Sequence, residues 1–304
     1  MVWRRNTLEQ TNKIINEESQ ATNAYETGEV DVLSLNPTAD LDYLAALPNT
    51  AQIRLVMPTC TMIRFNMSEN SIMNNKDARY AVMYATDFNA VKNIAYGGLG
   101  TVPQFIISAN GDETEPEFLN ATTIYSDLAN GPNYDLAKEY AEKAGIVGKT
   151  LTIINDSTAV FQSSCEVLQA CLGNIGVNLE IVNYDAGSFK EKYASPDGWD
   201  MFPSEHSNPT NASYPLATRI ITANKLCWSG PEYDAVNAQA KEVVGTFDPA
   251  KRKTLMEDFL VVLQDYSPAY NLLDNVKVYT YDSRLRGVEI FRMHDFLIKD
   301  WSWV

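Results

Sequence analysis

Histidine and cysteine, which often carry nucleophilic or metal chemistry, are scarce in this chain. Only His206 and His294 occur among 304 residues, so a Ser-His-Asp triad has few ways to form, and the motif G-x-S-x-G does not occur. The four cysteines form no C-x-x-C pair, and a structural zinc site would lack ligands. The 39 acidic residues leave a carboxylate pair of the glycosidase type open, but abundance alone does not indicate one. These residues do not predict an enzyme.

The cysteines are expected to be buried thiols. Cys165 and Cys171 lie six residues apart in a segment with helical spacing, which places them on different faces and prevents a bond between them. Cys60 and Cys227 are distant from this pair in sequence. A disulfide between distant positions stays open if the chain lives outside the cytoplasm.

The stretch 195–211 (SPDGWDMFPSEHSNPTN) is the best candidate for ligand contacts. It is rich in Pro, Gly, Ser and Asn, yet it contains Trp199, Phe202 and His206. Loops that mix aromatic and polar side chains often hold ligands, so we expect a ligand-binding loop here. Core packing of the two aromatic rings is an equally good interpretation, and His206 fits a loop histidine better than a nickel ligand.

The charge balance narrows the choice of partners. The formal net charge is −15 and the pI about 4.6, a surface that repels phosphate backbones and so argues against nucleic acid. Such a surface serves solubility, and it can also attract cationic or amine-bearing ligands. The apolar share of 45% is ample for one large domain or two modest ones, and no apolar run approaches the roughly 18–20 residues of a membrane helix.

The hydrophobic spacing predicts a chain of alternating helices and strands. Helices are expected at 77–93, 134–144 and 158–174, and strands at 149–155 and 177–184. This succession predicts a crossover with at least partly parallel strands. Residues 52–66 predict two extended runs interrupted by Pro58. Two further helices are expected at 231–244 and 249–265, the second with Asp248 as N-cap and Pro249 at its first position.

Several segments, taken in chain order, carry a family pattern. They are AYETGEVDVL (24–33), IRFNMSENSIMNNKDARYAVMYATDFNAV (63–91), PNYDLAKEYAEKAGI (132–146), CLGNIGVNLEIVNYD (171–185), PEYDAVNAQA (231–240), FDPAKRKTLMEDFLVVLQDYSPAYNL (247–272) and RLRGVEI (284–290). Together they resemble the bacterial extracellular solute-binding proteins of family 5, which include the oligopeptide-, dipeptide- and nickel-binding proteins of ABC importers. In the second segment the matching positions are Asn66, Arg79, Ala81, Ala85 and Asp87. The match covers nearly the whole chain.

The resemblance implies an α/β fold of the periplasmic-binding-protein type II kind, with a mixed sheet flanked by helices. It implies that residues 1–58 are part of a first lobe whose N-terminal region is missing. Residues 59–270 would form the C-terminal solute-binding lobe, and 271–304 the hinge return and the last segment of the first lobe. The start MVWRRNTLEQ lacks the apolar core of an export signal. We therefore expect the C-terminal half of an exported, lipid-anchored protein.

The resemblance also implies the function and the contacts. The expected function is the capture of an oligopeptide or dipeptide for an ABC permease in the membrane, by a monomer without catalysis, cofactor or metal. Peptide-binding members place an aspartate four residues before a proline, and the count back from Pro209 reaches Glu205, with Phe202 at the family's tryptophan position. Trp199, His206 and Asn208 complete the predicted contacts. Glu for Asp and Phe for Trp depart from the family, so nickel chelates, oligosaccharides or a ligand-free interaction or sensing module remain alternatives.

Overall fold

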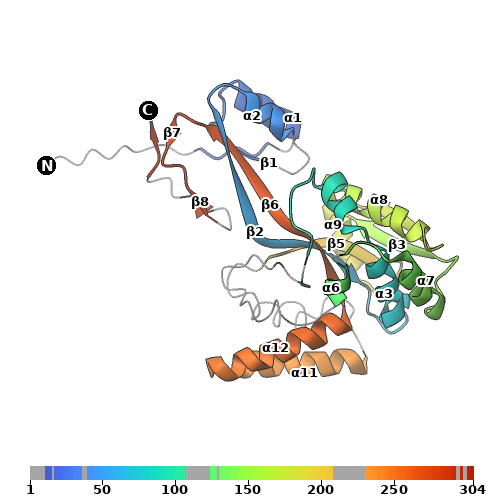
Figure 1. The fold of residues 1–304 in the computed structure, drawn as a ribbon. Helices are drawn as coiled ribbons and strands as arrows, with labels where there is room; N and C mark the ends of the chain where they lie inside the picture. The colour runs from blue at the N-terminus through green and yellow to red at the C-terminus, as the bar shows by residue number, and fades with distance from the viewer. Residues whose placement is uncertain are drawn as a thin grey trace. The chain divides into compact units, whose positions relative to one another are not determined.

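The computed structural model describes residues 11–15, 17–35, 40–103, 105–106, 108, 124–128, 130–207, 230–291, 295–296 and 300–304 (Figure 1). The chain divides into two compact units. Unit 1 comprises Met1–Met57 and Val276–Val304, and unit 2 comprises Pro58–Asn275. Two long strands, β2 (Thr50–Phe65) and β6 (Ala269–Asp282), contribute residues to both units.

Unit 1 is built from short elements around a small core. Its helices are α1 (Glu18–Glu26) and α2 (Leu41–Ala46), and its short strands are β1 (Val32–Leu35), β7 (Leu285–Arg286), β8 (Ile290–Phe291), β9 (Asp295–Phe296) and β10 (Ser302–Trp303). β1 pairs antiparallel with β6, β7 with β10 and β8 with β9. Gly28, at φ 70°, follows α1 and its C-cap Thr27. Ala21, Tyr25, Leu33 and Leu44 form the core.

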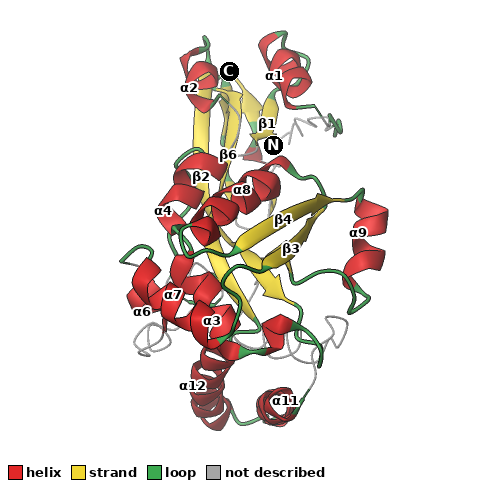
Figure 2. Ribbon diagram, turned by 90° about the vertical axis from the view of Figure 1, so that its right-hand side faces the viewer, coloured by secondary structure: helices red, strands yellow, loops and turns green. Residues whose placement is uncertain are grey.

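Unit 2 contains the mixed sheet that the sequence predicts. The sheet has the order β1-β6-β2-β5-β3-β4, and unit 2 contributes β5 (Met201–Ser207), β3 (Thr150–Asn155), β4 (Asn178–Asn183) and parts of β2 and β6. β2 and β5 are antiparallel from Thr59↔Ser207 to Phe65↔Met201, whereas β3 is parallel to β4 and to β5. The helix α8 (Ala159–Gly173) connects β3 to β4, which confirms the predicted parallel crossover (Figure 2).

Helices cover both faces of this sheet. Leu151 and Ile153 of β3 are buried in one cluster with Cys165 and Leu168 of α8. Ile154, which points to the other face because side chains alternate along a strand, packs with Phe189 of α9 (Ala186–Tyr193). The sheet is thus apolar on both faces, as a mostly buried sheet requires.

The remaining helices surround the core of unit 2. They are η1 (Ile72–Asn74), α3 (Lys76–Ala85), α4 (Phe88–Ala90), η2 (Val91–Ala95), α6 (Ile124–Leu128), α7 (Tyr134–Lys143), α11 (Pro231–Gly245) and α12 (Pro249–Tyr266). Asp248 caps α12 by accepting a hydrogen bond from Lys251 N at 2.8 Å, and Pro249 occupies its first turn, as predicted. None of the helices in the described ranges has both the length and the apolar character needed to cross a bilayer.

Three sequence predictions of local structure are wrong. The helix expected at 77–93 breaks at Thr86, which is extended, because Asp87 caps a new turn by accepting from Ala90 N at 2.9 Å. Pro58 does not interrupt the run 52–66, because it precedes Thr59, the first residue paired with β5, and so removes no donor from that ladder. The loop expected at 195–211 contains the strand β5 instead.

Two expectations about the cysteines are confirmed among the described residues. Cys60, Cys165 and Cys171 are buried free thiols, so Cys165 and Cys171 do not bond to each other. Cys227 lies outside the described residues.

Candidate functional site at the carboxyl edge of the unit 2 sheet

The parallel strands of unit 2 end in polar side chains. β3 ends at Asn155, β4 at Asn183 and β5 at Ser207. In α/β sheets, ligands bind outside the carboxyl ends of parallel strands. We call the set Thr59, Thr61, Tyr96, Asn155, Asn183, Glu205, Ser207 and Asn275 the carboxyl edge.

Glu205 lies on β5 beside a network of hydroxyl and amide groups. It is exposed and pairs with Thr61 of β2, so the two side chains are on the same face. Thr61 Oγ1 accepts a hydrogen bond from the Tyr96 hydroxyl and donates to Asn275 Oδ1 at 3.2 Å. Asn275 Nδ2 in turn donates to Thr59 Oγ1 at 3.1 Å. Burial, and to a smaller extent the charge of Glu205, raise the pKa of Tyr96, so this phenol stays a neutral donor.

The His206 side chain does not lie on the same face of β5 as Glu205. His206 pairs with Cys60, and its side chain leaves β5 on the face opposite to Glu205. It is 4% exposed. The described residues contain no group of three or more His, Cys, Asp and Glu side chains arranged to hold a metal ion.

Trp199 and Phe202 are packed in a cluster with Ile154 and Phe189, and each is 3% exposed. Phe202 stacks on Tyr193 at a centroid distance of 4.9 Å and meets Trp199 edge-on at 5.3 Å. Trp199 Nε1 donates to the Ser195 carbonyl at 2.6 Å. The packing corresponds to the core interpretation of both rings, while a ligand contact by either ring stays a prediction. Asn208, the fifth predicted contact, lies outside the described residues.

Asn155 is a candidate that sequence reasoning missed. Its side chain is fully buried, and Nδ2 donates to Asn183 Oδ1 at 3.2 Å and to Gln162 Oε1 at 3.3 Å. Its Oδ1 has no hydrogen-bond partner, which is costly for a buried acceptor and is frequent at ligand sites. The available signal was an amide residue at the end of an apolar strand, directly before a helix.

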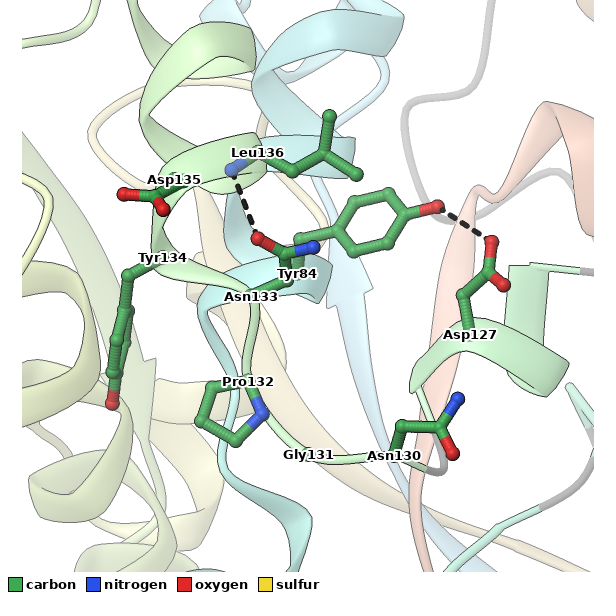
Figure 3. Close-up of a pocket in the computed structure, with 9 residues that line it drawn as sticks. All are labelled: Tyr84, Asp127, Asn130, Gly131, Pro132, Asn133, Tyr134, Asp135 and Leu136. Atoms are coloured by element: carbon green, nitrogen blue, oxygen red, sulfur yellow. Dashed lines mark hydrogen bonds between the residues drawn. The ribbon is translucent and has the colours of Figure 1, made fainter.

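A hollow lies at the start of α7. It has a volume of about 740 Å³ and is lined by Tyr84, Asp127, Asn130, Gly131, Pro132, Asn133, Tyr134, Asp135 and Leu136 (Figure 3). Three of its polar side chains make hydrogen bonds within the chain: the Tyr84 hydroxyl donates to Asp127 Oδ2 at 3.4 Å, and Asn133 Oδ1 caps α7 by accepting from Leu136 N at 3.1 Å. Burial, followed by the Asp127 charge, raises the pKa of Tyr84 to about 12. It shares no residue with the carboxyl edge.

The described residues of unit 2 form an α/β lobe with polar side chains at the carboxyl ends of its parallel strands. The family model described as "Bacterial extracellular solute-binding proteins, family 5 Middle" matches residues 9–225. The chain therefore belongs to family 5 of the bacterial extracellular solute-binding proteins, as its motifs predict.

Individual relatives are distant. The chain is 23% identical over 276 residues to heme-binding protein A of Haemophilus influenzae, covering 86% of this chain and 48% of that protein. A structure of a putative peptide-binding protein AppA from Clostridium difficile matches with a TM-score of 0.79 at 19% identity, over 96% of this chain and 60% of that one. NikA from Brucella suis, in complex with Fe(III)-EDTA, matches with a TM-score of 0.82 at 13% identity, over 96% and 61%. The chain thus spans about half the length of the curated relative and three fifths of these solved chains. Two of the three are named as binding proteins, one for heme and the other, as a putative one, for peptides.

Proposed function

We propose that this chain captures an extracytoplasmic solute for an ABC importer, and that the solute is an oligopeptide or dipeptide with a free amino terminus. Family membership and the peptide-binding relative support solute capture. Delivery to a membrane permease, a second lobe supplied by a longer, lipid-anchored parent, and a monomeric state are parts of the same proposal.

The observation that carries the choice of ligand is the chemistry of the carboxyl edge. Glu205 is exposed there as an anion, and Asn155 Oδ1 is a buried acceptor without a partner. A site of this kind suits a ligand that brings a cation and N–H donors, which is what a peptide amino terminus offers. The net charge of −15 adds a long-range attraction for the same group.

The other predicted contacts have different parts in the proposal. Phe202 and Trp199 would restrict the movement of β5 and so hold Glu205 in place, because their rings are packed in the core. Asn208, directly after Ser207, would contribute to the ligand surface at the end of β5, whereas the buried His206 would act only through the position of that strand.

A metal chelate is the second candidate. One relative is named for heme and another is in complex with an iron chelate. Because the described residues offer no cluster of metal ligands, such a metal would have to arrive with its own chelator. Oligosaccharides fit less well, since the two predicted stacking rings are packed in the core.

Isothermal titration of this chain with a tetrapeptide and its N-acetylated form tests the proposal. We expect the free amine to bind more tightly, and Glu205→Gln to cost about 1.5–3 kcal/mol of binding free energy, as for hydrogen bonds to charged groups. Glu180→Gln is the matched control, since Glu180 is an exposed glutamate on β4 of the same sheet.

The role of Glu205 would be refuted if Glu205→Gln and Glu180→Gln lost the same binding free energy. It would also be refuted if the acetylated peptide bound as tightly as the peptide with a free amine. A thermal shift with nickel or iron chelates and none with peptides would replace the peptide by a chelate. Stable monomers that respond to neither would favour an interaction or sensing module.

A further inference from the structure

Arg64 has a hydrogen-bonding capacity that the chain uses only in part. It lies on β2 opposite Phe202, and its Nε donates to Ser204 Oγ at 2.6 Å. This is its one hydrogen bond within the described residues. A guanidinium carries five N–H donors in a planar fork, so the two terminal nitrogens retain four.

Arg64 also has no counter-ion in the part of the chain that the structure describes. None of the ion pairs found there includes it, although acidic residues outnumber basic ones by 39 to 24. Its side chain is partly buried, and this burial is the largest cause of a lowered pKa; Cys60 and then Tyr193 act in the opposite direction. A desolvated cation without an anion is costly, and a bound anion would offset that cost.

The side chains around Arg64 are held in place by strand pairing and ring packing. Ser204 and Phe202 leave β5 on the same face as Arg64, because Phe202 is its direct partner and Ser204 is two residues further on. The Tyr193 ring stacks on Phe202 with an interplanar angle of 13°. Since Ser204 Oγ accepts from Arg64, its own hydrogen can point to a third group.

This position is separate from the carboxyl edge. Arg64 is on the face opposite to Glu205, because the partner of Glu205 is Thr61, an odd number of residues away. Arg64 also lies five residues from Thr59, the partner of Ser207, which corresponds to about 16 Å along the strand. The Arg64 side chain is therefore not part of the carboxyl edge.

We propose that Arg64 and Ser204 form an oxyanion site in unit 2 that binds a carboxylate. The two terminal nitrogens of the guanidinium match the two oxygens of a planar carboxylate, and the Ser204 hydroxyl supplies a further donor. A single positive charge balances a monoanion, whereas a phosphate dianion would call for a second cation, and neither Ser204 nor Tyr193 provides one.

Acetate is the probe that tests this site, with phosphate and chloride at matched ionic strength for comparison. We expect acetate to shift the Arg64 Nε–Hε resonance saturably and to raise the melting temperature of the chain. Arg64→Gln should weaken acetate binding at least about tenfold, and Arg64→Lys and Ser204→Ala should weaken it less. Circular dichroism establishes that each variant is folded.

Two controls separate this site from other effects. Arg284→Gln removes an exposed arginine that is already paired with Asp282, and it should leave acetate binding unchanged. Glu205→Gln should also leave it unchanged, so a failure of the proposed peptide site would not affect this result. The proposal would be overturned if acetate did not shift the Arg64 resonance or if Arg64→Gln bound acetate as tightly as the wild type. Tighter binding of phosphate than of acetate would also overturn it.

Discussion

The guanidinium of Arg79 on α3 donates a hydrogen bond to the carbonyl of Tyr266, the last residue of α12, at 2.7 Å. The same cation lies 5.5 Å from the centroid of the Tyr266 ring. A second nitrogen donates to the carbonyls of Met73 and Asn74 at 2.8 and 3.0 Å. Arg79 is fully buried, so one side chain completes the backbone hydrogen bonding of two segments that are distant in sequence.

Removal of this side chain should be strongly destabilising. We expect Arg79→Ala to lower the free energy of unfolding by about 3–5 kcal/mol, because three carbonyls around a buried side chain lose their donor. Urea unfolding followed by circular dichroism measures the change. Lys138→Ala, on the exposed side of α7, is the control and should change stability by less than about 0.5 kcal/mol. Similar values for the two variants would contradict this account of Arg79.

Gly100 is required by a close approach of two chain segments. Its φ is 90°, and a Cβ there would lie 2.6 Å from Leu273 Cδ2 and 2.8 Å from the carbonyl oxygen of Asp274. That carbonyl cannot move freely, because it accepts a hydrogen bond from Thr101 N at 3.0 Å.

Gly98 supplies the matched comparison, with φ 79° and no atom within 4 Å of the place that a Cβ would occupy. Both alanine variants carry the strain of positive φ, but only Gly100→Ala adds a steric clash. We therefore expect Gly100→Ala to be less stable than Gly98→Ala by about 1–3 kcal/mol in thermal unfolding. Equal melting temperatures of Gly100→Ala and Gly98→Ala would show that the segment around Asp274 moves to accommodate the added Cβ.

Asp200 should make the stability of the chain depend on acidity. Burial raises the pKa of its carboxyl, partly offset by the hydrogen bond from Thr152 N at 2.7 Å. The folded state therefore holds this proton more tightly than the unfolded state. It follows that the free energy of unfolding falls as the pH rises from the ordinary value of 3.8 through the raised value.

Denaturant unfolding over a pH series measures this dependence. The stability of the wild type relative to Asp200→Asn should decrease across that range, because asparagine cannot ionise but can still accept from Thr152 N. Asp197→Asn, which replaces an exposed neighbour in sequence, is measured over the same pH series as a control. A wild-type curve parallel to that of Asp200→Asn would exclude the contribution of Asp200.

The sequence predicted those helices and strands for which capping residues, prolines and apolar spacing all indicate the same structure. For α12, the Asp248 cap, the Pro249 start and the apolar spacing all point to a helix, and the helix forms there. The parallel pairing of β3 with β4 follows in the same way from an apolar strand, a long helix and a second strand.

The sequence predictions were wrong where hydrogen bonding or strand pairing outweighed the local pattern. Asp87 fits the helical spacing as a surface residue, but its carboxylate caps a new turn instead. In β5, pairing with β2 overrides the turn-forming tendency of Pro203 and Ser204. The surroundings of Asn155 depend on how β3, β4 and α8 meet, which no local sequence window contains.

The arrangement of the two units has a consequence for biosynthesis. Unit 2 is one continuous stretch that is complete once Asn275 has left the ribosome, whereas unit 1 needs residues from both sides of it. During translation the interior unit can therefore fold while the earlier segment, including β1, still lacks its partner strand residues 278–281. Unit 1 is thus completed after unit 2, because the residues that pair with β1 follow unit 2 in the chain.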